Sequence, residues 1–337
     1  MKSETEAEGS VRASSYVIHT RGLSKTYNRG KASKEVIALE SLDLGVPRNS
    51  IFGFLGPNGA GKTTTIKLLL GLIRPTGGSA SIFGLDIGRN SVAIRDRIGY
   101  LPQDPRFYEH MTAREILRFT AGFSFKGPAA EIDKRVEETL ELVGLAGKAD
   151  RPVKGFSGGE RQRLGIGQAQ VNYPDLLILD EPAASLDPLG RRDVLRVMER
   201  LRKHTTIFYC THILDDVERV SDSVAILNRG TVVAQGPIEE LLAGGDGVVY
   251  TVTMEGDVES AYRRLGSQEW VTDIRSKTRN GATAWTIRVT DPDAAKARLL
   301  RLLLADEQVI VTSFGRKEYE LEEIFVSVVE GVQHDCG

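Results

Sequence analysis

The chain has 337 residues, of which 41% are hydrophobic and 27% charged, a composition typical of a globular protein with a substantial core. Its 44 Lys and Arg residues nearly balance its 46 Asp and Glu residues, and a net charge of −2 excludes a surface-wide attraction to nucleic acid or to an anionic membrane. This length predicts two domains, and two cysteines without metal-ligand spacing predict free thiols in a reducing compartment.

The start of the chain has no targeting signal that we can identify. Residues 1–14 are rich in Ser and Glu, and we expect a disordered tail without the basic and apolar regions of a signal peptide. No stretch approaches the roughly 18 apolar residues that a membrane span requires. We therefore expect a cytoplasmic protein that reaches the inner face of the cell membrane only through a partner.

The first part of the chain predicts strands that lead into a glycine-rich loop. Residues 16–19 begin a strand, and residues 36–46 alternate apolar and polar side chains as a half-buried strand does. The polar, basic stretch at 28–35 between them indicates an exposed loop. An apolar strand at 51–55 and an apolar helix at 66–70 then enclose the glycine-rich loop.

The loop fits the G-x-x-x-x-G-K-[ST] pattern of a phosphate-binding loop in its strand–helix context. Glycines let backbone N–H groups curl around phosphates, and the following helix directs its positive end at the same anion. We expect Lys62 to reach the β- and γ-phosphates and the Thr63 hydroxyl to ligate Mg²⁺. The candidate nucleotide-binding residues of the loop are Gly56, Pro57, Asn58, Gly59, Ala60, Gly61, Lys62, Thr63 and Thr64.

Beyond this loop the pattern alternates between strands and helices. Short strands are expected at 79–83 and 98–101, and the helix-rich stretch of about 104–165 indicates a helical insert. Continuous apolar runs at 176–179 and 206–210 suit the buried middle of a parallel sheet. The remaining predicted elements of this part are helices at 111–119, 130–143, 191–204 and 213–220 and a hairpin of 224–228 with 231–235.

Two carboxylates close the apolar strand at 176–179. Because ligands bind at the carboxyl edge of a parallel sheet, Asp180 is expected to hold Mg²⁺, through a water molecule, and Glu181 to act as the general base. Two solvated carboxylates at a strand end are the alternative. The separate phosphate loop and the four preceding apolar residues favour the catalytic interpretation.

A second glycine-containing helix start lies between the phosphate loop and Asp180. Ser157, Gly158 and Gly159 precede a helix, and exposed N–H groups at such a helix start form an anion site. A simple N-cap followed by flexible glycines is the alternative.

These motifs together resemble the ATP-binding cassette (ABC) ATPases, whose S-G-G-Q signature is similar to Ser157-Gly158-Gly159-Glu160. The resemblance covers about Tyr16 to Leu242. It implies that Tyr27 stacks on adenine, that Gln103 lies in the Q-loop and contacts Mg²⁺ and the attacking water, and that His212 contacts the γ-phosphate. Asp187 lies in the family's D-loop, within Leu186-Asp187-Pro188.

The resemblance also implies how two chains cooperate. In the family the signature helix closes on the γ-phosphate of the opposite subunit, so one phosphate loop and one signature per chain predict a head-to-tail dimer holding two ATP molecules. We expect a homodimer, or pairing with a related cassette. The nucleotide-binding residues then include Ser157, Gly158, Gly159, Glu160 and Asp187, and the catalytic ones are Glu181, His212, Gln103 and Lys62.

Three departures from the family pattern concern the signature and the D-loop. Glu160 replaces the common glutamine and adds a charge, and Phe156 stands where leucine is usual. The run Ala183-Ala184-Ser185 replaces the familiar threonine–x–glycine before the D-loop. These changes leave the phosphate loop and the carboxylate pair intact.

The glycine run at 244–247 is expected to be a linker to a second domain at 248–337. The predicted order there is strand, helix, strand, strand, helix, strand, with Asn280-Gly281 as a hairpin turn, which suggests a small ferredoxin-like domain. A final helix places Leu321, Ile324 and Phe325 on one apolar face. The predicted fold is thus an α/β P-loop NTPase cassette at 15–243, with a RecA-like parallel core, an antiparallel β subdomain and a helical subdomain, followed by a small α+β domain.

The resemblance implies an ATPase subunit of a transporter, with ATP and Mg²⁺ as cofactors, that powers a separately encoded transmembrane permease. The second domain resembles that of cassettes serving drug and antibiotic exporters, which favours export over import. A soluble cassette acting on ribosomes or nucleic acid is the alternative, and a regulatory nucleotide-binding module is a third. The balanced charge, the single cassette and the intact Glu181 and His212 disfavour these two.

Overall fold

The computed structural model describes residues 16–27, 35–125, 127–242, 248–279, 282–305, 309–317 and 320–329. The predicted tail at 1–14, the linker at 244–247 and the Asn-Gly turn lie outside the described residues. The chain divides into two compact units, the first ending at Gly236 and the second beginning at Pro237. Each unit is described by itself.

The described strands of the first unit form one ten-stranded sheet in the order β5-β4-β1-β2-β10-β9-β3-β8-β7-β6. The neighbours β3, β8, β7 and β6 run parallel, as do β3 and β9, whereas β1 pairs antiparallel with β2 and β4. The strands are β1 (Tyr16–Tyr27), β2 (Val36–Pro47), β3 (Ile51–Leu55), β4 (Gly77–Ile82), β5 (Leu85–Asp86), β6 (Ile98–Leu101), β7 (Leu176–Asp180), β8 (Thr206–Thr211), β9 (Ser223–Asn228) and β10 (Thr231–Pro237).

The parallel part is buried on both faces, and this explains its continuous apolar runs. Every residue of β3, β7 and β8 is buried. Phe208 packs against Phe52 and Phe54, with ring centroids 6.0 and 5.3 Å apart. Each fully buried side chain of this size stabilises the fold by about 1.5–3 kcal/mol. The predicted parallel core is confirmed.

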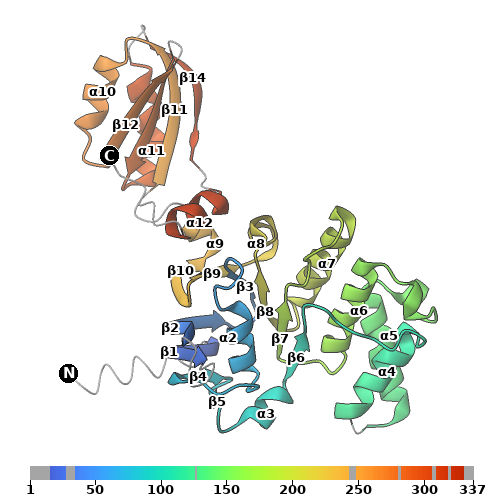
Figure 1. The fold of residues 1–337 in the computed structure, drawn as a ribbon. Helices are drawn as coiled ribbons and strands as arrows, with labels where there is room; N and C mark the ends of the chain where they lie inside the picture. The colour runs from blue at the N-terminus through green and yellow to red at the C-terminus, as the bar shows by residue number, and fades with distance from the viewer. Residues whose placement is uncertain are drawn as a thin grey trace. The chain divides into compact units, whose positions relative to one another are not determined.

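Helices flank this sheet, and Figure 1 shows α4, α5 and α6 (green) grouped beyond the edge strand β6. This group is the predicted helical insert, although its first helix begins only at Ala113, where Thr112 and Glu115 form a reciprocal capping box. The helices of the unit are α2 (Lys62–Leu69), α3 (Ser91–Arg95), α4 (Ala113–Ser124), α5 (Ala129–Leu142), α6 (Gly158–Gln170), α7 (Pro188–Leu201) and α8 (Leu214–Val220), with 3₁₀ turns η1 (Ala146–Lys148) and η2 (Val153–Gly155).

Several boundaries differ from the predictions for physical reasons. Strand β1 continues to Tyr27. Register shifts and the left-handed Gly22 (φ 54°) interrupt its apolar alternation without ending the strand, so the sequence pattern does not show this continuation. The short elements β5 and α3 were not predicted, since two and five residues carry too little periodicity. The predicted hairpin is present as β9 and β10, and Arg229 and Gly230 both have positive φ at its turn.

The second unit contains a four-stranded antiparallel sheet in the order β12-β13-β11-β14. With the chain order strand, helix, strand, strand, helix, strand, this is the topology of the expected ferredoxin-like domain. Its core includes Trp285 and Leu299. The elements are α9 (Ile238–Leu242), β11 (Val248–Gly256), α10 (Glu259–Gly266), β12 (Val271–Arg279), β13 (Ala282–Val289), α11 (Pro292–Leu303), β14 (Val309–Arg316) and α12 (Leu321–Val329).

The units divide earlier in the chain than the expected linker. Helix α9, which was not predicted, belongs to the second unit and contacts α12, the predicted final helix. Leu321 at the start of α12 is fully buried.

A matched pair of glycines tests the packing of α6 on the sheet. A Cβ on Gly99 of β6 would lie 2.1 Å from the Ala169 carbonyl oxygen of α6, whereas exposed Gly122 of α4 has no neighbour within 4 Å. We expect Gly99→Ala to lower the free energy of unfolding by about 1–3 kcal/mol. Gly122→Ala should raise it by about 0.5–1 kcal/mol through helix propensity. Denaturant titration measures both, and equal effects would contradict the close packing.

Candidate functional site

The phosphate loop joins the end of β3 to the start of α2, and its glycines approach neighbouring backbone closely. A Cβ on Gly56 would lie 2.5 Å from the Leu227 carbonyl oxygen of β9. Gly61 has a φ of 115°, and its Cβ would lie 2.6 Å from the Ala38 carbonyl oxygen of β2. Only glycine fits either position, so the loop keeps its backbone accessible.

The Lys62 ammonium lies inside this loop and is almost fully buried. Its Nζ donates hydrogen bonds to the carbonyl oxygens of Gly56, at 2.6 Å, and of Pro57, at 3.4 Å. The same Nζ lies 3.5 Å from Oε1 of Glu181. A buried cation thus stands between the loop backbone and the candidate base.

Glu181 follows β7 in a strained backbone conformation. Its φ is 51°, in the left-handed region, and its N–H donates to the Cys210 carbonyl oxygen at 3.0 Å. Such strain costs on the order of 1–3 kcal/mol and is concentrated at functional sites. Its carboxylate is buried, and Oε2 lies 2.9 Å from Nδ1 of His212. With Glu181 ionised, Nδ1 carries the hydrogen and donates it to this oxygen.

Three oxygen-bearing side chains at the site are suited to a hard cation. Among the described residues, no hydrogen bond engages the Thr63 hydroxyl, the Gln103 amide or the Asp180 carboxylate, although Asp180 is only 4% exposed. A hydroxyl, an amide oxygen and a carboxylate are ligands that Mg²⁺ accepts, with phosphate and water completing its shell. The described residues contain no cluster of three or more His, Cys, Asp or Glu side chains that could hold a metal alone.

The environment of Asp180 opposes its charge. Burial raises the pKa of Asp180, the neighbouring Glu181 carboxylate raises it further, and Lys62 opposes both in part. A bound cation would reverse this balance, because it favours the ionised carboxylate. The pKa shift therefore fits a residue that needs a metal ion close by.

Part of this group of residues lines a cleft of about 310 Å³. The cleft brings together most of the predicted loop with Gln103, Glu181 and His212. Asp180, Gly56, Ala60 and Tyr27 lie outside its lining. The lining residues are Val36, Ile37, Ala38, Pro57, Asn58, Gly59, Gly61, Lys62, Thr63, Thr64, Gln103, Glu181 and His212.

The apolar wall of the cleft was missed by the sequence analysis. Val36 and Ile37 begin β2 and are 43% and 63% exposed, and exposed apolar residues at a strand start were the available signal. Tyr27 pairs with Val36 at the edge of this wall, and the Lys25 ammonium lies 5.1 Å from its ring centroid. An aromatic ring and two aliphatic side chains suit a flat, apolar ligand part.

The signature residues form a second group, and none of them lines the cleft. Ser157 caps α6, and a Cβ on Gly159 would lie 3.1 Å from the Gly190 Cα of α7. Asp187 caps α7 by accepting the Gly190 N–H at 3.2 Å. The predicted signature and D-loop residues are therefore brought together, with two glycines in contact between the helices.

A partly buried ion pair connects α7 with the helix that follows His212. Arg191 Nε lies 2.5 Å from Oδ1 of Asp216, which is 1% exposed. Burial raises the pKa of Asp216, although Arg191 partly opposes this effect. The start of α7 and the start of α8 are thereby fixed to each other.

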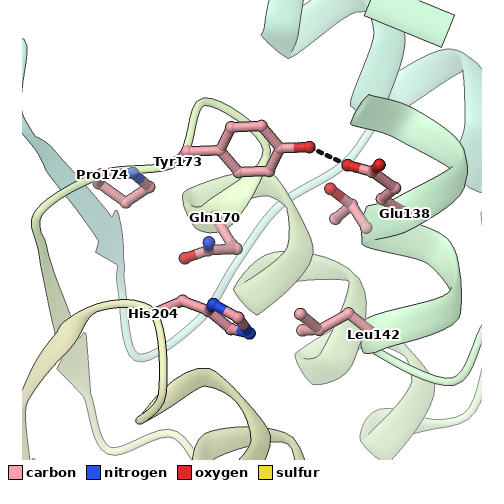
Figure 2. A pocket seen from close by; sticks show the side chains of 7 residues that line it. Glu138, Leu142, Gln170, Tyr173, Pro174 and His204 are labelled. Atoms are coloured by element: carbon pink, nitrogen blue, oxygen red, sulfur yellow. Dashed lines mark hydrogen bonds between the residues drawn. The ribbon is translucent and has the colours of Figure 1, made fainter. Parts of the chain in front are cut away.

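A separate cavity of about 470 Å³ lies between α5, the end of α6 and the turn before β8. Figure 2 shows Gln170, Leu142 and His204 around it, with the Tyr173 phenol donating to the Glu138 carboxylate at one side. Burial, and then this bond, raise the pKa of Tyr173 to about 12. None of its lining residues belongs to the cleft at the phosphate loop.

Comparison with known proteins identifies the family. Residues 39–184 match the ABC transporter family. The chain is 36% identical over 313 residues to the ABC transporter ATP-binding protein YxlF of Bacillus subtilis, covering 93% of this chain and 99% of that protein.

The chain belongs to the ABC transporter ATP-binding proteins.

Two further relatives of this ABC protein carry specific names. It is 34% identical to the daunorubicin/doxorubicin resistance ATP-binding protein DrrA of Streptomyces peucetius, over 92% of each chain. It is 41% identical to the bacitracin transport ATP-binding protein BcrA of Bacillus licheniformis, over 67% of this chain and 72% of that one. The ABC protein is thus an ATP-binding subunit of a transporter and an ATPase.

Solved structures confirm the cassette fold of the ABC protein. The structure of cbiO1 from Clostridium perfringens matches with a TM-score of 0.62 and 29% identity, over 68% of this chain and 92% of that one. A dimeric cassette, MJ0796, bound to ADP and phosphate matches with a TM-score of 0.59 and 23% identity, over 66% and 98%. No helix in the described part of the ABC protein combines the length and apolar composition needed to cross a bilayer.

The departure before the D-loop has a structural cost. Ser185 stands where the family pattern has glycine, and its φ is 59°, in the left-handed region that glycine adopts without strain. Ser185 therefore adopts this left-handed turn conformation at a conformational free-energy cost of roughly 1–2 kcal/mol.

The field around Asp180 predicts a pH-dependent stability change. Because the pKa of Asp180 is raised in the folded state, the ionised carboxylate destabilises the fold. This destabilisation is absent below the unfolded-state pKa and fully present above the folded-state pKa. Asp180→Asn should therefore raise the melting temperature by a few degrees at pH 7, without nucleotide or Mg²⁺, and by less at pH 4.5. Differential scanning calorimetry measures this.

The matched control is Asp175→Asn at the other end of β7. Asp175 is half-exposed and pairs with Arg97 at 2.6 Å. Its loss should lower stability slightly at pH 7, because exposed pairs contribute about 0–1 kcal/mol. A gain from Asp180→Asn that grows towards low pH would refute the burial argument.

Proposed function

We propose that this chain is the Mg²⁺-dependent ATPase subunit of an exporter, working as a pair of cassettes on a separately encoded permease. The contacts that Lys62 and His212 make with the Glu181 carboxylate support catalysis rather than regulatory nucleotide binding. Similarity to the drug resistance protein DrrA extends over 92% of this chain and so includes the second unit, which supports export.

The cleft residues divide the work of hydrolysis between them. The loop N–H groups and Lys62 bind the β- and γ-phosphates, and Tyr27 with the start of β2 receives the adenine. Thr63, Gln103 and, through water, Asp180 would hold Mg²⁺, which neutralises charge on the phosphate oxygens. Dispersed phosphate charge is thus met by a buried ammonium and by backbone dipoles.

Glu181 acts as the general base in the chemical step. The His212 N–H fixes Oε2 and so limits rotation of the carboxylate, which lines the cleft. A water molecule gives one proton to Glu181 while its oxygen bonds to the γ-phosphorus. The bond from phosphorus to the β–γ bridging oxygen breaks, and ADP and phosphate leave.

The separation of the signature group from the cleft supports a paired arrangement. Ser157 to Gly159 do not line the cleft of their own chain. In a two-fold pair each signature helix would present its N–H groups to the γ-phosphate on the other chain. ATP would then join the two cassettes, and its hydrolysis would release them.

The permease is assigned to the surface around Gln103. A groove of about 410 Å³ is lined by Pro102, Pro105 and Arg106 on both sides of Gln103 and by Thr120 of α4. On the same helix Phe119 and Phe123 are 51% and 73% exposed and pack edge to face. Exposed aromatic pairs of this kind mark protein contact sites.

We expect Glu181→Gln to bind ATP with the parent affinity and to lose turnover by about 100-fold or more, because the phosphate contacts remain while the base is lost. The variant should form a dimer with ATP that size-exclusion chromatography detects. Glu199→Gln, at an exposed position of α7, is the control and should match the parent. Hydrolysis by Glu181→Gln at the parent rate would refute the assigned base.

We expect the tagged chain, purified from detergent-solubilised membranes of its host, to retain a multi-spanning membrane protein identified by mass spectrometry. Phe119→Ser with Phe123→Ser should remove that protein without changing the melting temperature, because both side chains are exposed. Tyr262→Ser, at an aromatic position of the second unit that is 44% exposed, is the control. Retention of ribosomal proteins or RNA instead would support the soluble-cassette alternative.

A further inference from the structure

The first turn of α6 contains a carboxylate beside a helix start that, in the proposed function, receives a phosphate. Glu160 is the third residue of this helix and only 7% exposed. A negative side chain at this position stabilises the helix dipole, but it repels an incoming anion at the same helix end. The family's glutamine at this position would create no such conflict.

Glu160 is ionised and its oxygens are both engaged. Burial raises its pKa, but hydrogen bonds from Lys148 and Ser157 together outweigh burial and leave the pKa below its usual value. Oε2 accepts the Ser157 N–H at 2.8 Å, and Oε1 accepts from the Lys148 ammonium. The carboxylate therefore brings a full negative charge, and one cation contacts it directly.

The remaining groups at this helix start include N–H donors that an anion could use. Ser157 Oγ accepts the Glu160 N–H at 3.3 Å. The N–H groups of Gly158 and Gly159 have no acceptor within the described chain, because the first N–H groups of a helix lack intrahelical partners. An anion bound by these two N–H groups would lie at the helix end that carries Glu160.

The nearby arginines of α6 are committed to other carboxylates. Arg161 donates to Glu109 at 3.0 Å, and Arg163 donates to Asp193 at 3.2 Å. Lys148 at the end of η1 is half-exposed, and its ammonium contacts Oε1 of Glu160. Among the described residues, Lys148 is the cation that contacts the Glu160 carboxylate.

We propose that Lys148 is a positioning residue for the nucleotide contact between paired cassettes: it neutralises Glu160 and so allows the Gly158 and Gly159 N–H groups to bind the γ-phosphate of the partner's ATP. This inference rests on the proposed function. A charged signature is tolerated here because its counter-ion comes from the helical insert.

A double-mutant cycle tests the proposal. In the Glu181→Gln background, Lys148→Met should weaken ATP-dependent dimerisation by about tenfold, because a like charge then faces the phosphate. Adding Glu160→Gln to Lys148→Met should restore most of this loss, and Lys148→Arg alone should retain most dimerisation. In the otherwise native chain, kcat should follow the same order. Analytical ultracentrifugation with ATP measures the dimer.

Salt and a matched lysine provide the controls. The Lys148→Met defect should shrink between 50 and 500 mM NaCl, since salt screens the repulsion. Lys134→Met removes the exposed partner of Glu138 on α5 and should dimerise like its parent. Melting temperatures within a few degrees of the parent show that the variants fold.

The outcomes separate this proposal from the one on which it rests. An active, dimerising parent whose Lys148→Met variant is unaffected, or is not rescued by Glu160→Gln, would overturn the role of Lys148 alone. The second result would make the ion pair a structural tie between η1 and α6. A parent without ATP hydrolysis and without an ATP-dependent dimer would overturn both proposals.

Discussion

The contact of Glu181 with Lys62 and His212 depends on the order of three parallel strands. Strands β3, β8 and β7 are neighbours, so the residues that follow them emerge at the same edge of the sheet. Lys62 follows β3 through the loop, His212 follows β8 directly, and Glu181 follows β7. A buried carboxylate would be costly alone, but an ammonium and a ring N–H accompany it here. Glu181 has its left-handed φ in the same place where its side chain meets both groups.

Much of this site could be predicted because its strands are short, apolar and buried on both faces. The runs at 51–55, 176–179 and 206–210 fixed where the chemical residues begin, and the glycine pattern fixed the loop between β3 and α2. The wall at Val36 and Ile37 was not predictable in this way, because it depends on how β2 passes the loop. Strand β1 was predicted too short, since Gly22 and the register shifts hide its continuation. Helix α9 has five residues, too few to distinguish a helix from a turn.

The pairing of Glu160 with Lys148 could likewise not be predicted from the sequence. Glu160 stood out as a departure from the signature pattern that keeps hydrogen-bonding capacity and adds a charge. Lys148 lies twelve positions earlier in a 3₁₀ turn, and no periodicity connects the two. The contact arises because the helical insert brings η1 beside the start of α6. The close approach of Gly159 and Gly190 has the same origin, since it depends on how α6 and α7 cross.

Little backbone pairing joins the part of the large sheet that ends at β2 to the part that begins at β10. Between β2 and β10 the register consists of Thr231 opposite Ser41, and the Glu40 N–H donates to the Gly230 carbonyl oxygen at 3.1 Å. One hydrophobic cluster nevertheless spans both parts, from Leu44 of β2 to Phe54 of β3. Side-chain packing is non-directional, whereas a ladder of hydrogen bonds imposes a fixed register. The alignment of the strands beside Tyr27 with the strand that precedes the phosphate loop therefore depends mainly on interlocking side chains and only slightly on paired backbone.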